Sequence, residues 1–112
     1  MANSFINKKV DLTTTGVTTL YTVPSASTAV IKSILVSEDS GNADTITITI
    51  TAGSDVFSLF KTKAVGANAT VELLTAPLVI EESEILKVTA ATANRLHVVV
   101  SALETKKRVV TT

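Results

Sequence analysis

Residues 45–51 read Thr-Ile-Thr-Ile-Thr-Ile-Thr, a strict alternation of two residue types. In an extended chain this period sends Ile46, Ile48 and Ile50 to one face and the threonines to the other. A helix would scatter the isoleucines around its circumference, whereas every residue of the run is β-branched and favoured on a pleated surface. The stretch therefore predicts a β-strand with one buried face. The same signature recurs along most of the chain and predicts an all-β protein.

Clusters of turn-forming residues divide the 112-residue chain into short segments of strand type. The predicted strands cover residues 9–14, 18–23, 29–37, 44–52, 55–63, 69–74, 78–80, 85–90 and 95–103. About seven to nine short strands without a helical period predict an antiparallel two-sheet sandwich of the jelly-roll or immunoglobulin-like kind. We expect an N-terminal arm over residues 1–10, a single β-sandwich domain over residues 11–104 and a C-terminal basic arm over residues 105–112.

Alternation also selects the residues that face the core. Ala90 and Ala102 belong to the inward set of their strands, and the larger members of the predicted core follow the same rule. The predicted core residues are Val30, Ile34, Val36, Ile46, Ile48, Ile50, Phe57, Val71, Leu73, Leu86, Val88, Leu96, Val98 and Val100. Residues 30–36 are apolar on both faces, which favours a central strand over a strand covered by a neighbouring subunit.

The charge of the chain is balanced overall but segregated along its length. Ten acidic and ten basic residues give a formal net charge of zero, which argues against a generic nucleic-acid binder. Between Asp11 and Glu104 lie all ten acids but only five bases, a formal balance of −5. Residues 12–31 are uncharged, yet they are too rich in Thr and Ser to span a bilayer, so no membrane association is expected.

The remaining bases lie near the two ends of the chain and form the candidate interaction residues. This set comprises Lys8, Lys9, Lys106, Lys107 and Arg108, together with the apolar Val109 and Val110. An acidic body with basic ends can attach to an acidic neighbour, including another copy of itself. The alternative is that these charges solubilise frayed termini.

Three polar features invite a chemical interpretation. His97 is the single histidine and lies on a predicted strand, so a solvent-facing histidine is favoured over a general base or a metal ligand. Residues 37–44 gather oxygen atoms around a glycine, but their spacing differs from that of a calcium-binding EF-hand loop, and a polar hairpin turn is preferred. Glu81, Glu82 and Glu84 indicate a solvated loop, with pairing to basic arms or a cation as alternatives.

No catalytic motif is visible, so neither an enzyme nor a cofactor is expected. Cysteine is absent, which rules out disulfides, thiolate metal sites and a cysteine nucleophile, and which suits assembly in a reducing cytoplasm. Sugar-binding and single-strand-binding sites rely on aromatic platforms, which are scarce here. The aromatic residues are Phe5, Tyr21, Phe57 and Phe60.

Residues 12–24 read Leu-Thr-Thr-Thr-Gly-Val-Thr-Thr-Leu-Tyr-Thr-Val-Pro, and residues 29–37 read Ala-Val-Ile-Lys-Ser-Ile-Leu-Val-Ser. A Ser-Gly-Asn turn at residues 40–42 and the Thr-Ile strand follow. In order and spacing, over about nine tenths of the chain, this pattern resembles a group of small virion proteins of tailed bacteriophages. The resemblance implies a non-enzymatic β-sandwich subunit of the particle, in the head decoration, neck, tail or fibre attachment.

Among these places the expected one is the capsid surface, as a decoration or cement protein bound to the major capsid protein, in a virion assembled in the host cytoplasm. The chain is expected to form a homo-oligomer, a dimer or a trimer, with some of its apolar outer strand face buried. Residues 1–10 and 105–112 are expected to contact other chains. The alternatives are a neck, tail or fibre-attachment component, and a small glycan- or calcium-binding module.

Overall fold

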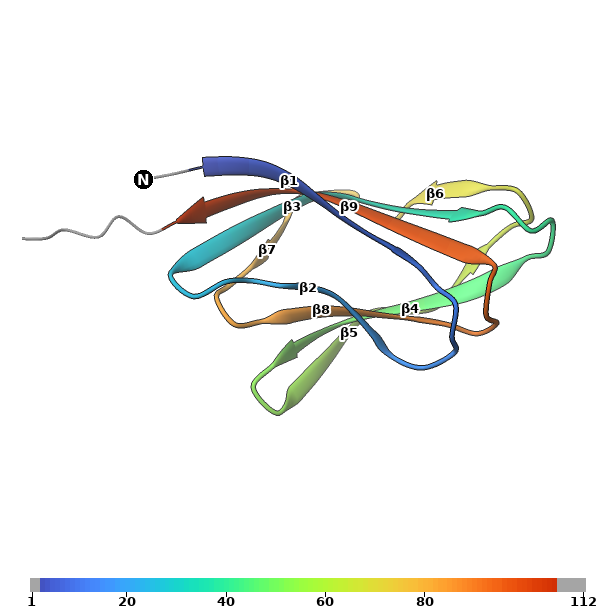
Figure 1. Cartoon of the computed structure of the whole chain (residues 1–112), viewed down its shortest axis with the longest axis horizontal. Helices are drawn as coiled ribbons and strands as arrows, with labels where there is room; N and C mark the ends of the chain where they lie inside the picture. Colours follow the sequence, from blue (N-terminus) through green and yellow to red (C-terminus); the bar gives the residue numbers. More distant parts are fainter. Residues whose placement is uncertain (1–2, 107–112) are drawn as a thin grey trace, which may run out of the picture.

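The computed structural model describes residues 3–106, which form nine β-strands and no helix (Figure 1). The strands are β1 (Asn3–Asp11), β2 (Thr18–Thr22), β3 (Ser27–Glu38), β4 (Asp44–Ala52), β5 (Asp55–Val65), β6 (Thr70–Glu72), β7 (Leu78–Ile80), β8 (Ile85–Ala90) and β9 (Leu96–Lys106). Over this part of the chain, no helix is long and apolar enough to cross a membrane. The predicted all-β class is confirmed.

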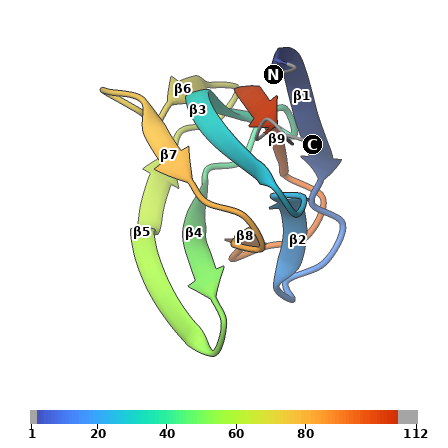
Figure 2. The ribbon, with the colours of Figure 1, turned by 90° about the vertical axis from the view of Figure 1, so that its left-hand side faces the viewer.

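The strands form two antiparallel sheets that pack face to face (Figures 1 and 2). The larger sheet has the order β1-β9-β3-β6, and the short strand β7 also pairs with β3. The smaller sheet has the order β2-β8-β4-β5. The predicted two-sheet sandwich is therefore confirmed, and β3 is a central strand, as its two apolar faces indicated.

Most connections between consecutive strands pass from one sheet to the other. The turn at residues 39–43 is one of them, because it joins β3 of the larger sheet to β4 of the smaller sheet. The prediction of a hairpin at this turn is wrong. A hairpin does join β4 and β5, where Ala52 pairs with Asp55 across a two-residue turn and Gly53 takes a positive φ of 61°. Glycine suits that position because it has no Cβ to clash in this conformation.

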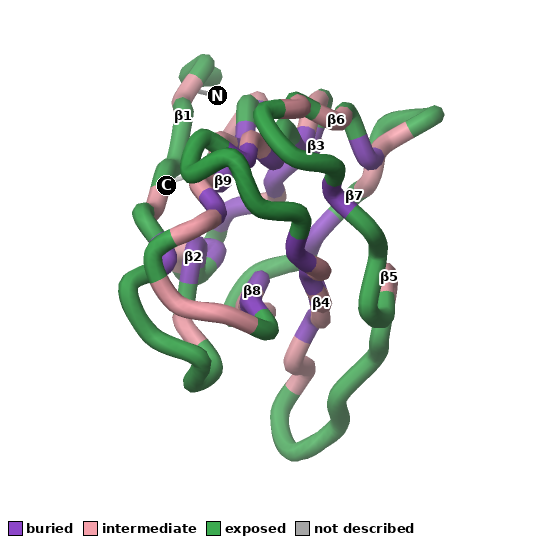
Figure 3. Tube along the Cα trace, turned by 90° about the vertical axis from the view of Figure 1, so that its right-hand side faces the viewer, coloured by how far each residue is buried: buried purple, intermediate pink, exposed green. Residues whose placement is uncertain are grey.

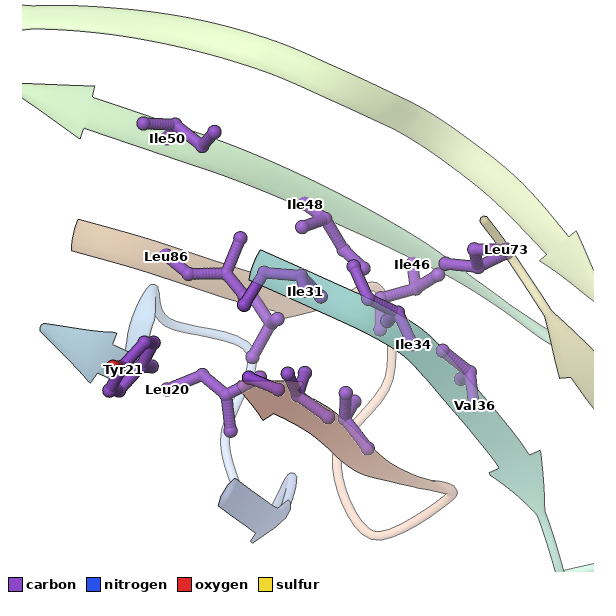
Figure 4. Close-up of a cluster of buried hydrophobic side chains, with 14 of the residues drawn as sticks. Leu20, Tyr21, Ile31, Ile34, Val36, Ile46, Ile48, Ile50, Leu73 and Leu86 are labelled. Carbon is purple, nitrogen blue, oxygen red and sulfur yellow. The ribbon is translucent and has the colours of Figure 1, made fainter. Parts of the chain in front are cut away.

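A cluster of aliphatic side chains fills the space between the sheets (Figure 4), and Figure 3 shows where the buried residues lie along the chain. The predicted core residues found buried are Ile34, Val36, Ile46, Ile48, Ile50, Leu73, Leu86, Val88, Leu96, Val98 and Val100. Ala90 and Ala102 are buried as predicted, and Val71 is half-buried against the cluster. Burial of this apolar area is the dominant stabilising contribution in a domain without disulfides.

The prediction that Val30 lies in the core is wrong. The register of β3 against β9 shifts between Ile31 and Ser33, so Lys32 is an extra residue in the strand. Before this bulge the odd-numbered Ala29 and Ile31 point inward, and after it the even-numbered residues do. A bulge reverses the parity of a strand. Because both faces of β3 are apolar, the sequence hides the shift, and Val30 points outward.

Phe57 was also predicted to be buried, but it is 56% exposed. It lies opposite Ile50 near the free end of the β4–β5 hairpin, which projects away from the larger sheet (Figures 1 and 3). β5 is the edge strand of its sheet, and its pairing with β4 is interrupted by register shifts. Because the end of the hairpin extends away from the larger sheet (Figure 1), the ring of Phe57 is left in solvent.

The first and last strands are longer than predicted. β1 begins at Asn3 instead of residue 9, because the stretch pairs with β9 from Asn3 opposite Thr105 to Asp11 opposite His97. β9 continues to Lys106 instead of ending at residue 103. The early part of β1 was missed because only Ile6 and Val10 of this edge strand pack against the core.

Candidate functional site

The structure separates the basic residues that the sequence grouped. Lys8 and Lys9 are neighbours on β1, so their side chains leave opposite faces of the larger sheet. Lys9 is opposite Val99 on the outer side, whereas the Lys8 amine lies 5.7 Å from the centre of the Tyr21 ring on the inner side. Lys106 is the last residue of β9. Lys107, Arg108, Val109 and Val110 lie outside the described residues.

Tyr21 links the two sheets through its hydroxyl group. It donates a hydrogen bond to Oε2 of Glu104, with 2.5 Å between the oxygens. Burial raises the pKa of Tyr21 above its ordinary value, and the hydrogen bond and the charge of Glu104 raise that pKa further. The pair therefore joins β2 of the smaller sheet to β9 of the larger sheet and acts as a structural tie.

His97 lies on the outer side of β9, half-exposed as predicted, between two carboxylates that the sequence did not associate with it. Its Nδ1 is 3.5 Å from Oδ1 of Asp11, and its Nε2 is 3.1 Å from Oδ1 of Asp39. A general base needs a ring nitrogen that faces the proton to be removed. Because a carboxylate lies beside each nitrogen, the arrangement joins β1, β9 and the β3–β4 connection and does not present a base.

Glu38 organises the loop that the sequence compared with a calcium site. This buried carboxylate accepts hydrogen bonds from the backbone N–H groups of Ser40 at 2.7 Å, Gly41 at 3.0 Å, Asn42 at 3.1 Å and Asn68 at 3.0 Å, and from the Ser40 hydroxyl. Burial alone would raise the pKa of Glu38, but these donors outweigh it and lower the pKa to about 2. The carboxylate is thus occupied by donors of its own chain.

The acidic loop before β8 uses its carboxylates in the same way. Glu82 accepts a hydrogen bond from the Ala26 N–H at 2.7 Å, and Glu84 accepts one from the Glu81 N–H at 2.7 Å. Among residues 3–106, no group of three or more acidic or histidine side chains is placed to hold a metal ion. These acidic residues serve turns and strand ends.

The larger sheet has an outer face, the side turned away from the smaller sheet, that exposes one row of apolar residues and a second row in which two apolar residues lie between two charged ones. Alternation on β9 defines it, because Val98, Val100 and Ala102 are buried and the residues between them point out. Residues that pair across neighbouring strands form rows on this face. We call row one the residues Phe5 on β1, Leu103 on β9, Val30 on β3 and Val79 on β7. Row two is Lys9, Val99, Leu35 and Glu72 on β1, β9, β3 and β6.

Several of these side chains are strongly exposed for apolar residues: Phe5 is 82% exposed, Val79 56% and Leu35 38%. A depression of about 260 Å³ beside the Phe5 ring is lined by Asn7, Lys32 and Ser101. The smaller sheet differs, because its outward positions on β4 are the threonines of residues 45–51. The smaller sheet also exposes Val56, opposite Thr51, but the larger sheet gathers apolar residues from four strands, which marks it as the candidate interaction surface.

Sequence reasoning did not find this surface as a unit. Phe5 was assigned to an arm, Val30 to the core, and Val79 lies between half-buried Leu78 and buried Ile80 on a strand of three residues. The signal that could have indicated the face was the two-sided apolar character of residues 30–36. The register across four strands, which brings distant residues into one row, is not visible in the sequence.

The fold and this surface define a small antiparallel β-sandwich of nine strands that presents one apolar sheet face. No protein-family model matches the chain, and no curated protein matches its sequence. Similarity is found with two crystal structures of a pentameric capsid protein isolated from metagenomic phage sequences, the second solved by iodide phasing, each at 20% identity. The TM-scores are 0.45 and 0.43, and the match covers 91% of this chain in both.

The chain spans 60% of the length of the first of these proteins and 62% of the second.

Proposed function

We propose that this chain is a non-enzymatic structural subunit of a tailed-bacteriophage virion, a capsid decoration or cement protein that binds and bridges major capsid subunits. The observation that carries the proposal is the outer face of the larger sheet, where six apolar side chains of two cross-strand rows lie together and Phe5, Val79 and Leu35 are the most exposed of them. A surface of this kind suits protein contact, because burying apolar area is the main driving force of association.

The sequence resemblance supports the same class. In the structure its residues belong to the framework of the sandwich: Leu12, Tyr21 and Val23 are buried, and residues 29–37 lie within the central strand β3. The Tyr-Thr-Val-Pro segment thus joins the two sheets at β2, and the Thr-Ile strand is β4. The pattern shared with virion proteins is therefore a pattern of fold-determining residues.

The polar groups favour a structural role over catalysis. His97 lies between two carboxylates, Glu38 accepts donors of its own loop, and the Tyr21 hydroxyl is bound to Glu104. An enzyme needs a nucleophile, a base or an electrophile that faces a substrate. Within the part of the chain described here, these groups instead connect strands and turns.

Attachment to a lattice gives a physical reason for the terminal residues. Each weak contact is multiplied when many copies bind neighbours held at fixed spacing. We assign the supporting contacts to Lys8, Lys9, Lys106, Lys107, Arg108, Val109 and Val110. Basic side chains near the ends complement an acidic partner surface and speed its encounter.

Location in the particle tests the proposal. Native particles are imaged by cryo-electron microscopy with a gold-labelled antibody raised against the purified chain. Label distributed over the head with the spacing of the capsid lattice is the expected result. A single ring of label at the neck or tail would refute the decoration role and favour a neck or tail component. Particles that contain no label would refute the virion role.

Removal of residues 106–112 tests whether the basic C-terminal residues contribute to attachment. The truncated and complete chains are each added to particles from which the protein has been stripped, and pelleting separates bound from free chain. The truncated chain is expected to bind more weakly, with the difference shrinking as salt is raised, since exposed charges are screened. Equal binding of both chains would remove the basic C-terminal residues from the contact.

A further inference from the structure

We propose that two copies of this chain pair face to face through the outer face of the larger sheet, about a twofold axis that runs along the strands between β9 and β3. The inference concerns the free protein in solution and uses the face that carries the proposed function, so attachment to a capsid would exchange the second copy for a capsid subunit. Figure 2 shows β7, β3, β9 and β1 following one another across this sheet, so the axis passes through the middle of the rows.

Row one is complementary to itself about this axis. Its order is Phe5, Leu103, Val30 and Val79, with the axis between the second and third members. Rotation places Phe5 opposite the partner's Val79 and Leu103 opposite the partner's Val30. All four residues are apolar, so each meets an apolar side chain, and the two most exposed, Phe5 and Val79, cover each other.

Row two repeats the arrangement with charges at its ends. Lys9 and Glu72 are its outermost members, and Val99 and Leu35 lie beside the axis. The rotation brings Lys9 opposite the partner's Glu72, and symmetry produces this pair twice. The two apolar members meet at the centre, so the row has an apolar middle and a polar rim, which is the usual anatomy of a protein interface.

Glu72 is held in place to supply that negative charge. Its Oε2 accepts hydrogen bonds from the Ile34 N–H at 2.8 Å and the Leu74 N–H at 3.2 Å, and its Oε1 accepts one from the Ser33 hydroxyl. These bonds fix the carboxylate beside the β3 bulge. Burial raises the pKa of Glu72 on its own, but the donors prevail and lower it below the ordinary value. The side chain is therefore ionised at neutral pH.

The choice of axis follows from the charges. A twofold axis in the interface plane, perpendicular to the strands and along row one, would set Phe5 against the partner's Phe5. The two copies of row two would then lie on opposite sides of the axis, and Lys9 would not meet the partner's Glu72. An axis along the strands keeps both rows in register and leaves the strands of the two sheets nearly aligned. Aligned packing of twisted sheets, about 10 Å apart, is a standard arrangement, and a twofold pair closes without further growth.

Two other surfaces are less suited to a second copy. The free edge of β1 has Lys8 directed inward over Tyr21, and inward lysines on edge strands oppose edge-to-edge pairing. The outward positions of β4 on the smaller sheet are threonines, which offer little apolar area. The outer face of the larger sheet carries polar residues between its rows, Asn7, Ser101 and Ser33 with Lys32 at the bulge. It is the face that a second copy fits, because the rows on either side combine apolar area with the Lys9 and Glu72 charges.

Cross-linking of single-cysteine chains tests the axis, because the natural sequence contains no cysteine. A Phe5→Cys chain and a Val79→Cys chain are mixed and treated with a thiol cross-linker about 10 Å long, matching the spacing of packed sheets. A covalent dimer is expected from the mixture and not from either chain alone. A covalent dimer from the Phe5→Cys chain alone would overturn the proposed axis, and an absence of cross-links in the mixture would overturn the pairing.

Sedimentation equilibrium of the full chain tests the surface. A mass of twice 11.7 kDa is expected, and Phe5→Glu is expected to raise the dimer dissociation constant about tenfold or more. Val17→Glu is the control, because Val17 is 67% exposed in the β1–β2 loop, away from both rows. A persistent monomer, a larger closed oligomer or equal effects of the two substitutions would each overturn the proposal. Thermal melts confirm that both variants are folded.

Discussion

The bulge in β3 decides which residues of the central strand face the core, and a pair of alanine substitutions tests it. Ile31 is fully buried, and Val30 beside it is half-exposed on the outer face. Ile31→Ala removes three buried carbons, a transfer loss of about 2.4 kcal/mol, to which the residual cavity adds, for a total of about 3 kcal/mol. Val30→Ala removes two carbons that are already partly in water and costs about 1 kcal/mol or less.

These energies become measurable as melting temperatures. A domain of this length has an unfolding entropy of about 0.24 kcal/mol/K, so about 3 kcal/mol lowers the melting temperature by about 13 °C and 1 kcal/mol by about 4 °C. The assay is thermal unfolding followed by circular dichroism on dilute protein, where self-association contributes little. A drop for Val30→Ala equal to or larger than that for Ile31→Ala would refute the inward position of Ile31 and with it the bulge at Lys32.

Three further predictions each concern a single residue. Glu38→Gln is expected to lower the melting temperature at neutral pH. The pKa of Glu38 falls from 4.5 to about 2 on folding, so the stabilisation by its charge is complete above pH 4.5 and is lost toward pH 2. Melts across this range are therefore expected to show the difference in melting temperature between the variant and the natural chain closing. Tyr21 is the single tyrosine of the chain, and burial and then Glu104 raise its pKa above the ordinary 10.0. In an alkaline absorbance titration it is therefore expected to ionise only when the protein unfolds. Ionisation at pH 10.0 in the folded protein would contradict the link between Tyr21 and Glu104. Gly53→Ala costs about 1 kcal/mol through its positive φ alone, since a Cβ there would meet no atom within 4 Å, whereas Gly16→Ala, outside that conformation, has little effect on the melt.

The strands were predictable where one face is buried and the other is not. In β4 and β8 the alternation of apolar and polar residues assigns every position, and Ile46, Ile48, Leu86 and Val88 are buried as predicted. Alternation succeeds there because the side-chain period of a strand is two and each face has a single environment. The same reasoning failed at Val30, where apolar residues on both faces conceal the added residue.

The candidate site was largely beyond sequence reasoning. Phe5 occurs in a polar stretch without alternation, and the pairing of β1 with β9 that places it beside Leu103 joins residues almost a whole chain apart. His97 was assigned to solvent, yet Asp11 and Asp39 reach it from a strand end and from a loop. Each case depends on which strand lies beside which, and local periodicity contains no information on that order.

The amino-acid sequence alone determined that this protein is built of β-strands, where most of them begin and end, and that its interior is aliphatic, because β-branched alternation and turn residues act over a few neighbouring positions. Tertiary structure alone decided the sheet order, the β3 bulge, the inward direction of Lys8 and the assembly of the two outer rows. Those features arise from pairing between distant segments, whose free energy depends on how the whole core closes and not on any local run of residues.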